Sequence, residues 1–350
     1  MSSSMTTMED PSGSSIRRVV LHFSDGESRT IEVAEGQEIL AAAKARGVNL
    51  ASQCTVGTCA TCISQLLVGD AQPKPDVVTV LTSEEASRGQ RLLCQTLAHS
   101  DAEFDMGYPS SLLLANPPVF FNAKIGRITR LAESVAEIEV KVPKTMRLKF
   151  TAGQYCRIRV PGTDDWRSYS MASGEHEPNK LTFLIRILPK GTMSDYLRDR
   201  AKAGDVLEME GPLGSFVLEP TQRPHLLVAG GTGLAPMLSM IDRLRLLRPA
   251  PPIQLVFGCV KEADLFHLDE LRARASFTPT LQVRISLEQD STIPGVLKGN
   301  PVTVLSRTDA PEGTIAYLCG PPGMIAAAEQ AMAGFGLSLS DVRSEQFLPS

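Results

Sequence analysis

Four cysteines in the sequence are spaced as ligands of an iron centre. Cys54, Cys59 and Cys62 follow the pattern C-x4-C-x2-C, and Cys94 comes later in RLLCQT. Three thiolates on one loop and a fourth from a distant segment are the plant-type ligand set of a [2Fe-2S] cluster. Small residues such as Gly57 let this loop curl, so that backbone N–H groups can point at the cluster sulfurs. Zinc also uses C-x2-C, but zinc ribbons generally supply two such pairs and this chain has one, which favours iron and sulfur.

The segments around these cysteines predict a small domain of one sheet and one main helix. Alternating residues around the turn SDGE predict a hairpin, and Gly47 follows a helical pattern where a left-handed C-cap is favoured. Thr82 and Glu85 are spaced as a capping box for a second, short helix. The predicted strands cover residues 17–23, 29–33 and 63–69, and the main helix covers residues 37–46. In this order, residues 16–105 resemble a plant-type ferredoxin, which implies a β-grasp-like fold; Ala60 stands where that family often has glycine.

Residues 122–222 predict an all-β module. Strand-like runs alternate there with turn residues at intervals typical of a barrel, after a stretch with three prolines, residues 106–121, that predicts an interdomain linker. One run is RSYSMAS. In it, Arg167 offers charge for a phosphate, Tyr169 a ring for stacking and Ser170 a hydrogen bond to a ring edge. Taken alone, this tetrapeptide motif also fits an ordinary exposed strand.

A predicted phosphate site follows RSYS in the sequence. The segment KGTMSDYLRDR places Gly191 and Ser194 at the start of a helix, whose first N–H groups can receive a pyrophosphate. Together, RSYS, FLIR and GTMS resemble the flavin domain of the ferredoxin-NADP reductase superfamily, an antiparallel β-barrel that binds FAD. The resemblance implies that FAD contacts Arg167, Ser168, Tyr169, Ser170, Arg186, Gly191, Met193 and Ser194.

In residues 223–350 strands and helices alternate, which predicts a doubly wound parallel sheet. AGGTGLAPM turns from the first of these strands into a helix, so that its bare backbone can approach phosphates. Pro236 takes the third glycine place of G-x-G-x-x-G, and a tight turn that binds nothing is the alternative interpretation. CGPPG forms a second strand-to-helix turn at the same carboxyl edge, where α/β sheets bind ligands.

GGTGLAP and CGPPGM together resemble the nicotinamide domain of the same superfamily, in which the cysteine lies beside the nicotinamide ring. The resemblance implies that the nucleotide contacts Gly230, Gly231, Thr232, Gly233, Cys319, Gly320 and Pro321. After the second strand, VKEADLF offers Glu262 and Asp264 to ribose hydroxyls and no arginine cluster to a 2′-phosphate, which favours NADH. Phe347 is near the end of the chain, where a residue of this superfamily covers the flavin.

Composition limits the partners and the compartment. With 35 basic and 39 acidic residues the net charge is −4, so no broad positive field attracts nucleic acid or anionic lipid. Residues 1–15 lack the features of a secretory signal and predict a disordered tail. Apolar runs such as SLLLANPPVFF are broken by proline and fall short of the roughly 20 residues that span a bilayer. Seven cysteines, an odd number, argue for a reducing compartment. We therefore expect a cytoplasmic protein without nucleic-acid or membrane partners.

The three modules predict one electron relay. A nicotinamide delivers two electrons together, whereas a [2Fe-2S] cluster accepts one at a time. FAD can accept the pair and pass the electrons on singly. We expect Ser170 and Cys319 to act as catalytic residues that shape the contact between NADH and FAD. Plant-type clusters lie near about −400 mV and Rieske centres at roughly −150 to +300 mV, so transfer onward to a Rieske centre is favourable.

Over nearly its whole length the chain resembles the reductase components of aromatic-ring-hydroxylating dioxygenases of the benzoate, toluate and anthranilate type. The resemblance implies an NADH:acceptor oxidoreductase whose protein partner is a terminal oxygenase component. Reductases of soluble di-iron monooxygenases share this domain order and are the first alternative. A redox sensor that binds a regulator is the second, and the predicted hydride-transfer site argues against it because a sensor needs no such site.

Overall fold

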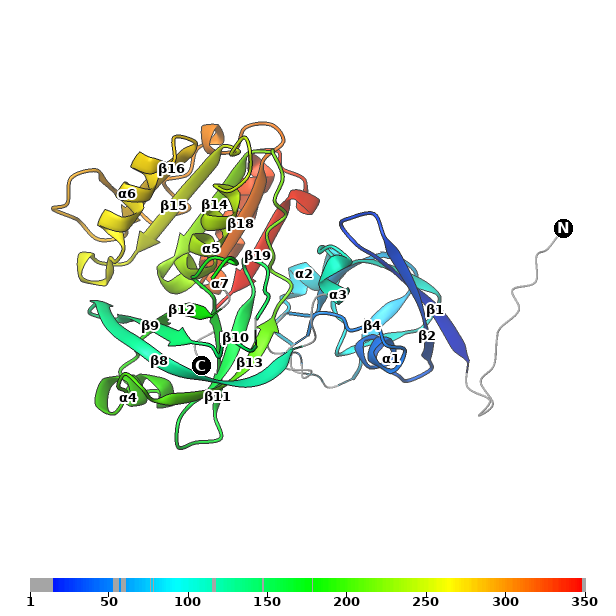
Figure 1. Cartoon of the computed structure of the whole chain (residues 1–350). Helices are drawn as coiled ribbons and strands as arrows, with labels where there is room; N and C mark the ends of the chain where they lie inside the picture. Colours follow the sequence, from blue (N-terminus) through cyan, green and yellow to red (C-terminus); the bar gives the residue numbers. More distant parts are fainter. Residues whose placement is uncertain are drawn as a thin grey trace. The chain divides into compact units, whose positions relative to one another are not determined.

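The computed structural model describes residues 15–52, 57, 61–75, 77, 79–114, 118–146, 148–177 and 179–347. The chain divides into two compact units (Figure 1). The first unit comprises residues 1–117 with 213–215, and the second comprises residues 118–212 with 216–350. Among the described residues, the helices are too short or too polar to cross a membrane.

The first unit is built on a five-stranded mixed sheet in the order β2-β1-β7-β3-β5. β1 pairs with β2 as an antiparallel hairpin and with β7 in parallel, and α1 packs on β2. This is the β-grasp-like arrangement predicted from the sequence. The elements are β1 Ile16–His22, β2 Ser28–Ala34, α1 Ile39–Ala45, β3 Ile63–Val68, β4 Ala71–Pro73, α2 Ser83–Ser87, β5 Gln90–Leu92, β6 Thr96–Ala98, β7 Ala102–Asp105 and α3 Ser111–Leu114.

Both helix-end signals predicted in this unit are present in the structure. Gly47 follows α1 at φ +77°, the left-handed conformation in which glycine avoids a Cβ penalty. The hydroxyl of Thr82 accepts from the N–H of Glu85, whose carboxylate accepts from the N–H of Thr82. The predicted C-cap and capping box are therefore confirmed, since each depends on residues only three or four positions apart.

The second unit begins with a six-stranded antiparallel sheet in the order β11-β10-β13-β8-β9-β12. A bridge between Met171 and Phe183 brings β11 and β12 together, so that the sheet closes as a barrel. β13, with Leu207 and Met209 buried and Glu208 on the outer face, is a strand that the sequence interpretation missed. The elements are β8 Val119–Ala132, β9 Val135–Lys141, β10 Tyr155–Arg159, β11 Trp166–Ser170, β12 Lys180–Arg186, α4 Thr192–Asp199 and β13 Val206–Leu213.

A parallel sheet in the order β17-β16-β15-β14-β18-β19 completes the second unit (Figure 1). Strand order reverses at β14, with β15 on one side and β18 on the other, which is where doubly wound sheets bind ligands. The elements are β14 His225–Gly230, η1 Gly231–Gly233, α5 Leu234–Leu244, β15 Ile253–Cys259, η2 Glu262–Asp264, α6 Leu268–Phe277, β16 Leu281–Leu287, β17 Val296–Lys298, η3 Arg307–Asp309, β18 Ile315–Gly320, α7 Pro322–Gly334, η4 Leu339–Asp341 and β19 Val342–Gln346.

We call residues 118–212 the barrel lobe and residues 225–347 the sheet lobe. The two lobes share one apolar core, in which Ala172 and Leu184 of the barrel lobe join Met237 of the sheet lobe. α5 contacts both β14 and β12. Because burial of this shared surface stabilises both lobes at once, the second unit presents its site residues on one framework.

Candidate functional site

Two glycine-containing turns meet at the carboxyl edge of the parallel sheet. A Cβ on Gly233 would come within 2.2 Å of the Cys319 carbonyl oxygen, and one on Gly230 within 2.7 Å of Met324 Sδ. Any side chain at Gly233 would therefore collide with backbone, which explains the glycine. The turn after β14 and the turn after β18 pack together and present bare backbone, as a phosphate-binding edge requires.

A hydroxyl and a carboxyl group meet beside this edge. Ser170 Oγ, at the end of β11 in the barrel lobe, donates to Glu345 Oε2 on β19 at 3.1 Å. In the parallel register of β18 and β19, Glu345 stands opposite Cys319. Ser170 and Cys319 are both buried. The fold thus brings together the two residues predicted to be catalytic and adds Glu345, which the sequence interpretation did not select.

The surroundings of Glu345 change its acidity. Burial raises the pKa of this carboxyl group to about 7, and the hydrogen bond from Ser170 only partly opposes the rise. The residue as a whole is only partly buried, which leaves its proton able to exchange with water. Burial and the neighbouring Glu345 raise the pKa of the Cys319 thiol well above its ordinary value. At neutral pH, Cys319 is therefore a neutral thiol, while Glu345 can either hold or release a proton.

A second cluster lies in the barrel lobe at the start of α4. Arg167 Nη2 donates to Thr192 Oγ1 at 3.3 Å and lies 3.4 Å from Asp165 Oδ2. Met193 is buried in the barrel core, and the Ser194 hydroxyl accepts from the Leu188 N–H at 3.0 Å. A guanidinium beside a helix N-terminus is a favourable site for a phosphate, because both present positive charge and N–H donors.

The remaining predicted flavin residues lie around these two clusters. Tyr169 packs against the barrel core, and burial raises the pKa of its hydroxyl. Ser168 points to the exposed face of β11, and Gly191 is the N-cap of α4. Arg186 ends β12, and the Phe347 N–H donates to the Gly320 carbonyl at 2.9 Å. Of the predicted nucleotide contacts, Gly231 and Thr232 lie in η1 and Pro321 is the N-cap of α7.

Asp264, a predicted nucleotide contact, is hydrogen-bonded to the barrel lobe. Its Oδ1 accepts from Ser134 Oγ of the barrel lobe at 2.5 Å. The neighbouring Glu262 accepts from Ser291 Oγ at 2.9 Å and from the Thr292 N–H at 3.0 Å. Both acidic side chains that the sequence offered to a ribose are therefore already hydrogen-bonded within the protein.

In the first unit, two of the four predicted cluster ligands can be described. Cys62 and Cys94 are buried, and the Leu93 N–H donates to the Cys62 carbonyl oxygen at 3.1 Å. This pairing of the segments before β3 and after β5 brings together two thiols that are remote in sequence. Cys54 and Cys59 lie outside the described residues. Thiols from two segments have the donor chemistry of an iron–sulfur site.

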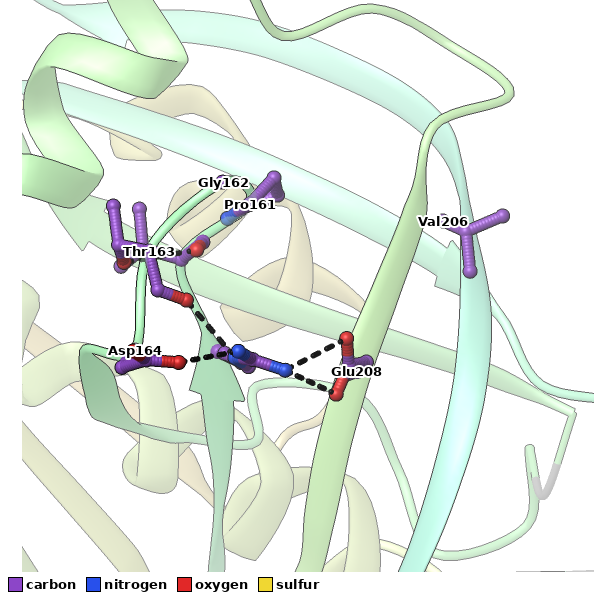
Figure 2. A pocket seen from close by; sticks show the side chains of 8 residues that line it. Pro161, Gly162, Thr163, Asp164, Val206 and Glu208 are labelled. Atoms are coloured by element: carbon purple, nitrogen blue, oxygen red, sulfur yellow. Dashed lines mark hydrogen bonds and ion pairs between the residues drawn. The ribbon is translucent and has the colours of Figure 1, made fainter.

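The barrel lobe also has a surface hollow of about 260 Å³ (Figure 2). Arg159, one of its lining residues, is bound by Glu208 at 3.0 Å, by Asp164 at 2.5 Å and by the Thr163 carbonyl at 2.9 Å. Each guanidinium nitrogen already has a partner within the protein. We assign no ligand to this hollow.

Comparison with known proteins identifies the three parts of the chain. Residues 22–99 match the 2Fe-2S iron-sulfur cluster binding domain, residues 122–218 the oxidoreductase FAD-binding domain and residues 227–330 the oxidoreductase NAD-binding domain. The chain is 34% identical to the anthranilate 1,2-dioxygenase electron transfer component of Acinetobacter baylyi, over 95% of this chain and 97% of that one. The chain belongs to the family of dioxygenase electron transfer components.

Two further relatives bear on the function of this electron transfer component. It is 34% identical to methane monooxygenase component C of Methylosinus trichosporium over 82% of this chain and 85% of that one. The crystal structure of the Amycolatopsis cytochrome P450 reductase GcoB superposes with a TM-score of 0.68 at 29% identity, covering 95% of this chain and 99% of that one. Together with the three domains, these relatives identify the electron transfer component as an NADH oxidoreductase that depends on FAD and a [2Fe-2S] cluster.

Proposed function

We propose that this electron transfer component passes electrons from NADH through FAD and its [2Fe-2S] cluster to a terminal oxygenase, most directly a Rieske-type aromatic-ring-hydroxylating dioxygenase. The observation that carries the proposal is the coexistence of all three cofactor domains in one chain with the junction of Ser170, Cys319 and Glu345. The relationship to the anthranilate dioxygenase component supports the oxygenase partner. We infer that it works in the cytoplasm, because its free cysteines suit a reducing compartment.

We assign the FAD phosphates to the cluster formed by Arg167 and the first turn of α4. Arg167 supplies a charged guanidinium whose Nη2 lies beside Thr192, and the helix supplies the positive end of its dipole. When bound, FAD accepts an electron pair and releases the electrons singly. Tyr169, on the same face of β11 as Arg167, provides a ring for stacking.

The carboxyl edge of the sheet receives the nicotinamide nucleotide in this proposal. The turns at Gly230 to Gly233 and at Cys319 to Pro321, which pack together at this edge, are the proposed contacts of the nucleotide phosphates. Cys319 contributes an uncharged surface that excludes water. Ser170 Oγ and Glu345 Oε2 hold a proton at the junction of the lobes, and the pKa of Glu345 near 7 lets this proton exchange with solvent.

Cys54, Cys59, Cys62 and Cys94 are the proposed ligands of the exit cluster. Replacing Cys94 with serine removes the thiolate contributed by the distant segment. We expect loss of NADH-dependent turnover by the oxygenase and survival of NADH-dependent ferricyanide reduction, because the dye can take electrons at the flavin. Cys156→Ser, the same change at a buried thiol of the barrel core, is the control and should keep both activities. Equal loss of both activities in Cys94→Ser would contradict the proposed order of transfer.

The direct test of the whole proposal is reconstitution. The purified protein, NADH and the candidate oxygenase are mixed with aromatic acids, and oxygen uptake and hydroxylated product are measured. Product that depends on all three components supports the proposal, whereas absence of NADH-dependent reduction of either ferricyanide or cytochrome c would overturn it. Tight nucleotide binding without turnover would instead indicate a redox sensor.

A soluble di-iron monooxygenase is the second candidate partner. The identity to methane monooxygenase component C equals that to the anthranilate dioxygenase component, although it covers less of the chain, 82% against 95%. Replacing the Rieske oxygenase with a di-iron hydroxylase in the same reconstitution distinguishes the two partners.

A further inference from the structure

The turn between β8 and β9 holds the segment that follows β15 at several points. These contacts join the barrel lobe to the sheet lobe on the far side of β14 from Ser170 and Glu345. We call them the lobe clasp, which consists of Glu133, Ser134 and Glu137 of the barrel lobe with Lys261, Asp264 and His267 of the sheet lobe.

The clasp is built from short polar contacts. Ser134 Oγ donates to Asp264 Oδ1 at 2.5 Å, and Lys261 Nζ lies 2.6 Å from Glu133 Oε2. The backbone takes part as well, since the Glu133 N–H donates to the Ala263 carbonyl at 3.0 Å. Main chain and side chains thus fix the same turn against the same segment.

A histidine anchors the other end of the clasp. His267 Nε2 lies 3.4 Å from Glu137 Oε2, and its Nδ1 lies 2.6 Å from Glu270 Oε2. Burial alone would lower the pKa of His267, but the two carboxylates outweigh it and raise the pKa to about 9. The ring is therefore a cation at neutral pH, with one carboxylate in each lobe.

Hydrogen bonds within the protein engage both acidic residues after β15. Asp264 is engaged by Ser134, and Glu262 is engaged by Ser291 and Thr292 of the sheet lobe. A ribose hydroxyl at either carboxylate would have to share it with these donors. Ser134 thus gives Asp264 a hydrogen-bond partner within the protein.

We propose that Asp264 is a positioning residue, which with Ser134 sets the angle of the sheet lobe on the barrel lobe and thereby the approach of nicotinamide to flavin. The inference rests on the proposed function, and it replaces the sequence-based role of Asp264 as a ribose acceptor. Nucleotide selection then does not depend on Asp264.

A small rotation about the clasp produces a larger displacement at β19, which carries Glu345. From β15 to β19 there are three strand spacings, through β14 and β18, or roughly 14 Å at about 4.8 Å each. A rotation of roughly 4° about the clasp would move β19 by about 1 Å, and an error of that size can cost about 100-fold in rate. A lost clasp contact should therefore affect the limiting rate more than nucleotide affinity.

The test measures Ser134→Ala, Asp264→Ala and the double variant in the full-length, FAD-loaded protein. Stopped-flow reduction of the flavin by NADH gives the limiting rate and the dissociation constant separately. We expect each single change to lower the limiting rate by about tenfold, with the dissociation constant changed less than about twofold and the preference for NADH over NADPH unchanged. The double variant should lose no more than either single one, because both remove one shared contact.

A second readout needs no turnover. Hydrogen exchange of the nucleotide-free protein should be faster in both single variants in peptides covering residues 131–137 and 260–267, since their mutual hydrogen bonds are weakened. Ser134→Thr keeps the hydroxyl and should restore slow exchange and rate. Ser15→Ala removes the same kind of bond in the first unit, where Ser15 donates to Glu35 at 2.6 Å, and should leave all these quantities unchanged.

Two results would overturn the inference. One is weaker NADH binding by Asp264→Ala at an unchanged limiting rate, or an altered preference between NADH and NADPH, which would assign Asp264 to the ribose. The other is wild-type exchange and wild-type rates in both single variants. If NADH fails to reduce the flavin even in the unaltered protein, the proposed function fails, whereas exchange still reports whether Ser134 and Asp264 hold the lobes together.

Discussion

Two polar contacts between the barrel lobe and the sheet lobe have opposite effects on the pKa of the carboxyl groups in them. At the buried contact, Glu345 receives one neutral hydroxyl, and burial raises the pKa of its carboxyl group to about 7. At the lobe clasp, Glu133 pairs with Lys261, and that lysine lowers the pKa of the carboxyl group. Beside it, His267 lowers the pKa of Glu270 to about 2.

The difference follows from whether a cation accompanies the carboxylate. A partner charge keeps the group ionised through the neutral range, so that it serves as an anchor of fixed charge. Burial without such a partner leaves the group able to gain or lose a proton near neutral pH, and within the described residues Glu345 has no ion-pair partner. One interface therefore contains a fixed electrostatic contact and a titrating one, and only the second is suited to proton exchange.

The largest effect should follow from removing the titrating group. Glu345→Gln retains the shape and an acceptor for Ser170 but cannot exchange a proton. We expect the limiting rate of flavin reduction by NADH to fall by about 100-fold, within the range for loss of a general acid or base. The pH profile from about pH 5 to about pH 9 should also lose the inflection near pH 7 that the pKa of Glu345 predicts. An unchanged inflection in the variant would assign it to another group.

The next effect concerns the stability of the clasp. The pKa of His267 rises from 6.5 to about 9 on folding, so the folded protein binds this proton more tightly than the unfolded chain. The resulting stabilisation is complete below pH 6.5 and is lost as the pH rises through 9, by about 3 kcal/mol. His267→Gln should remove this dependence. Urea unfolding, followed by fluorescence of Trp166, the one tryptophan of the chain, measures it at both ends of the range. Glu270→Gln should give a partial loss, because Glu137 remains.

Much of the framework could be predicted because its signals are local. The capping box of Thr82 and Glu85 and the positive φ of Gly47 depend on a few adjacent residues. The turns at Gly233 and Cys319 were predicted to share one edge because parallel strands align their carboxyl ends. These features follow from pattern and periodicity without knowledge of the tertiary contacts.

The missed residues depend on register and on contact between lobes. Glu345 is one alternating position in a short final strand, and only the pairing of β19 with β18 sets it opposite Cys319. Asp264 fits a ribose acceptor in the sequence, but Ser134, which engages it, lies 130 positions away in another lobe. No local pattern encodes such a pair.

The smallest effect is on the pH dependence of the free energy of unfolding, and it concerns Glu345. The pKa of Glu345 rises from 4.5 to about 7 on folding. The folded protein therefore favours the protonated form, and a destabilising contribution develops as the pH rises from 4.5 and is complete above 7. Glu345→Gln lacks this contribution. It should be more stable than the unaltered protein by about 1 kcal/mol at about pH 8, allowing for the partial exposure of the residue, and equally stable at about pH 4. Urea unfolding at these two pH values tests the difference. Lower stability of the variant at about pH 8 would mean that the Glu345 carboxylate is compensated in the folded protein, and its role as a proton-exchanging group would then lose its physical basis.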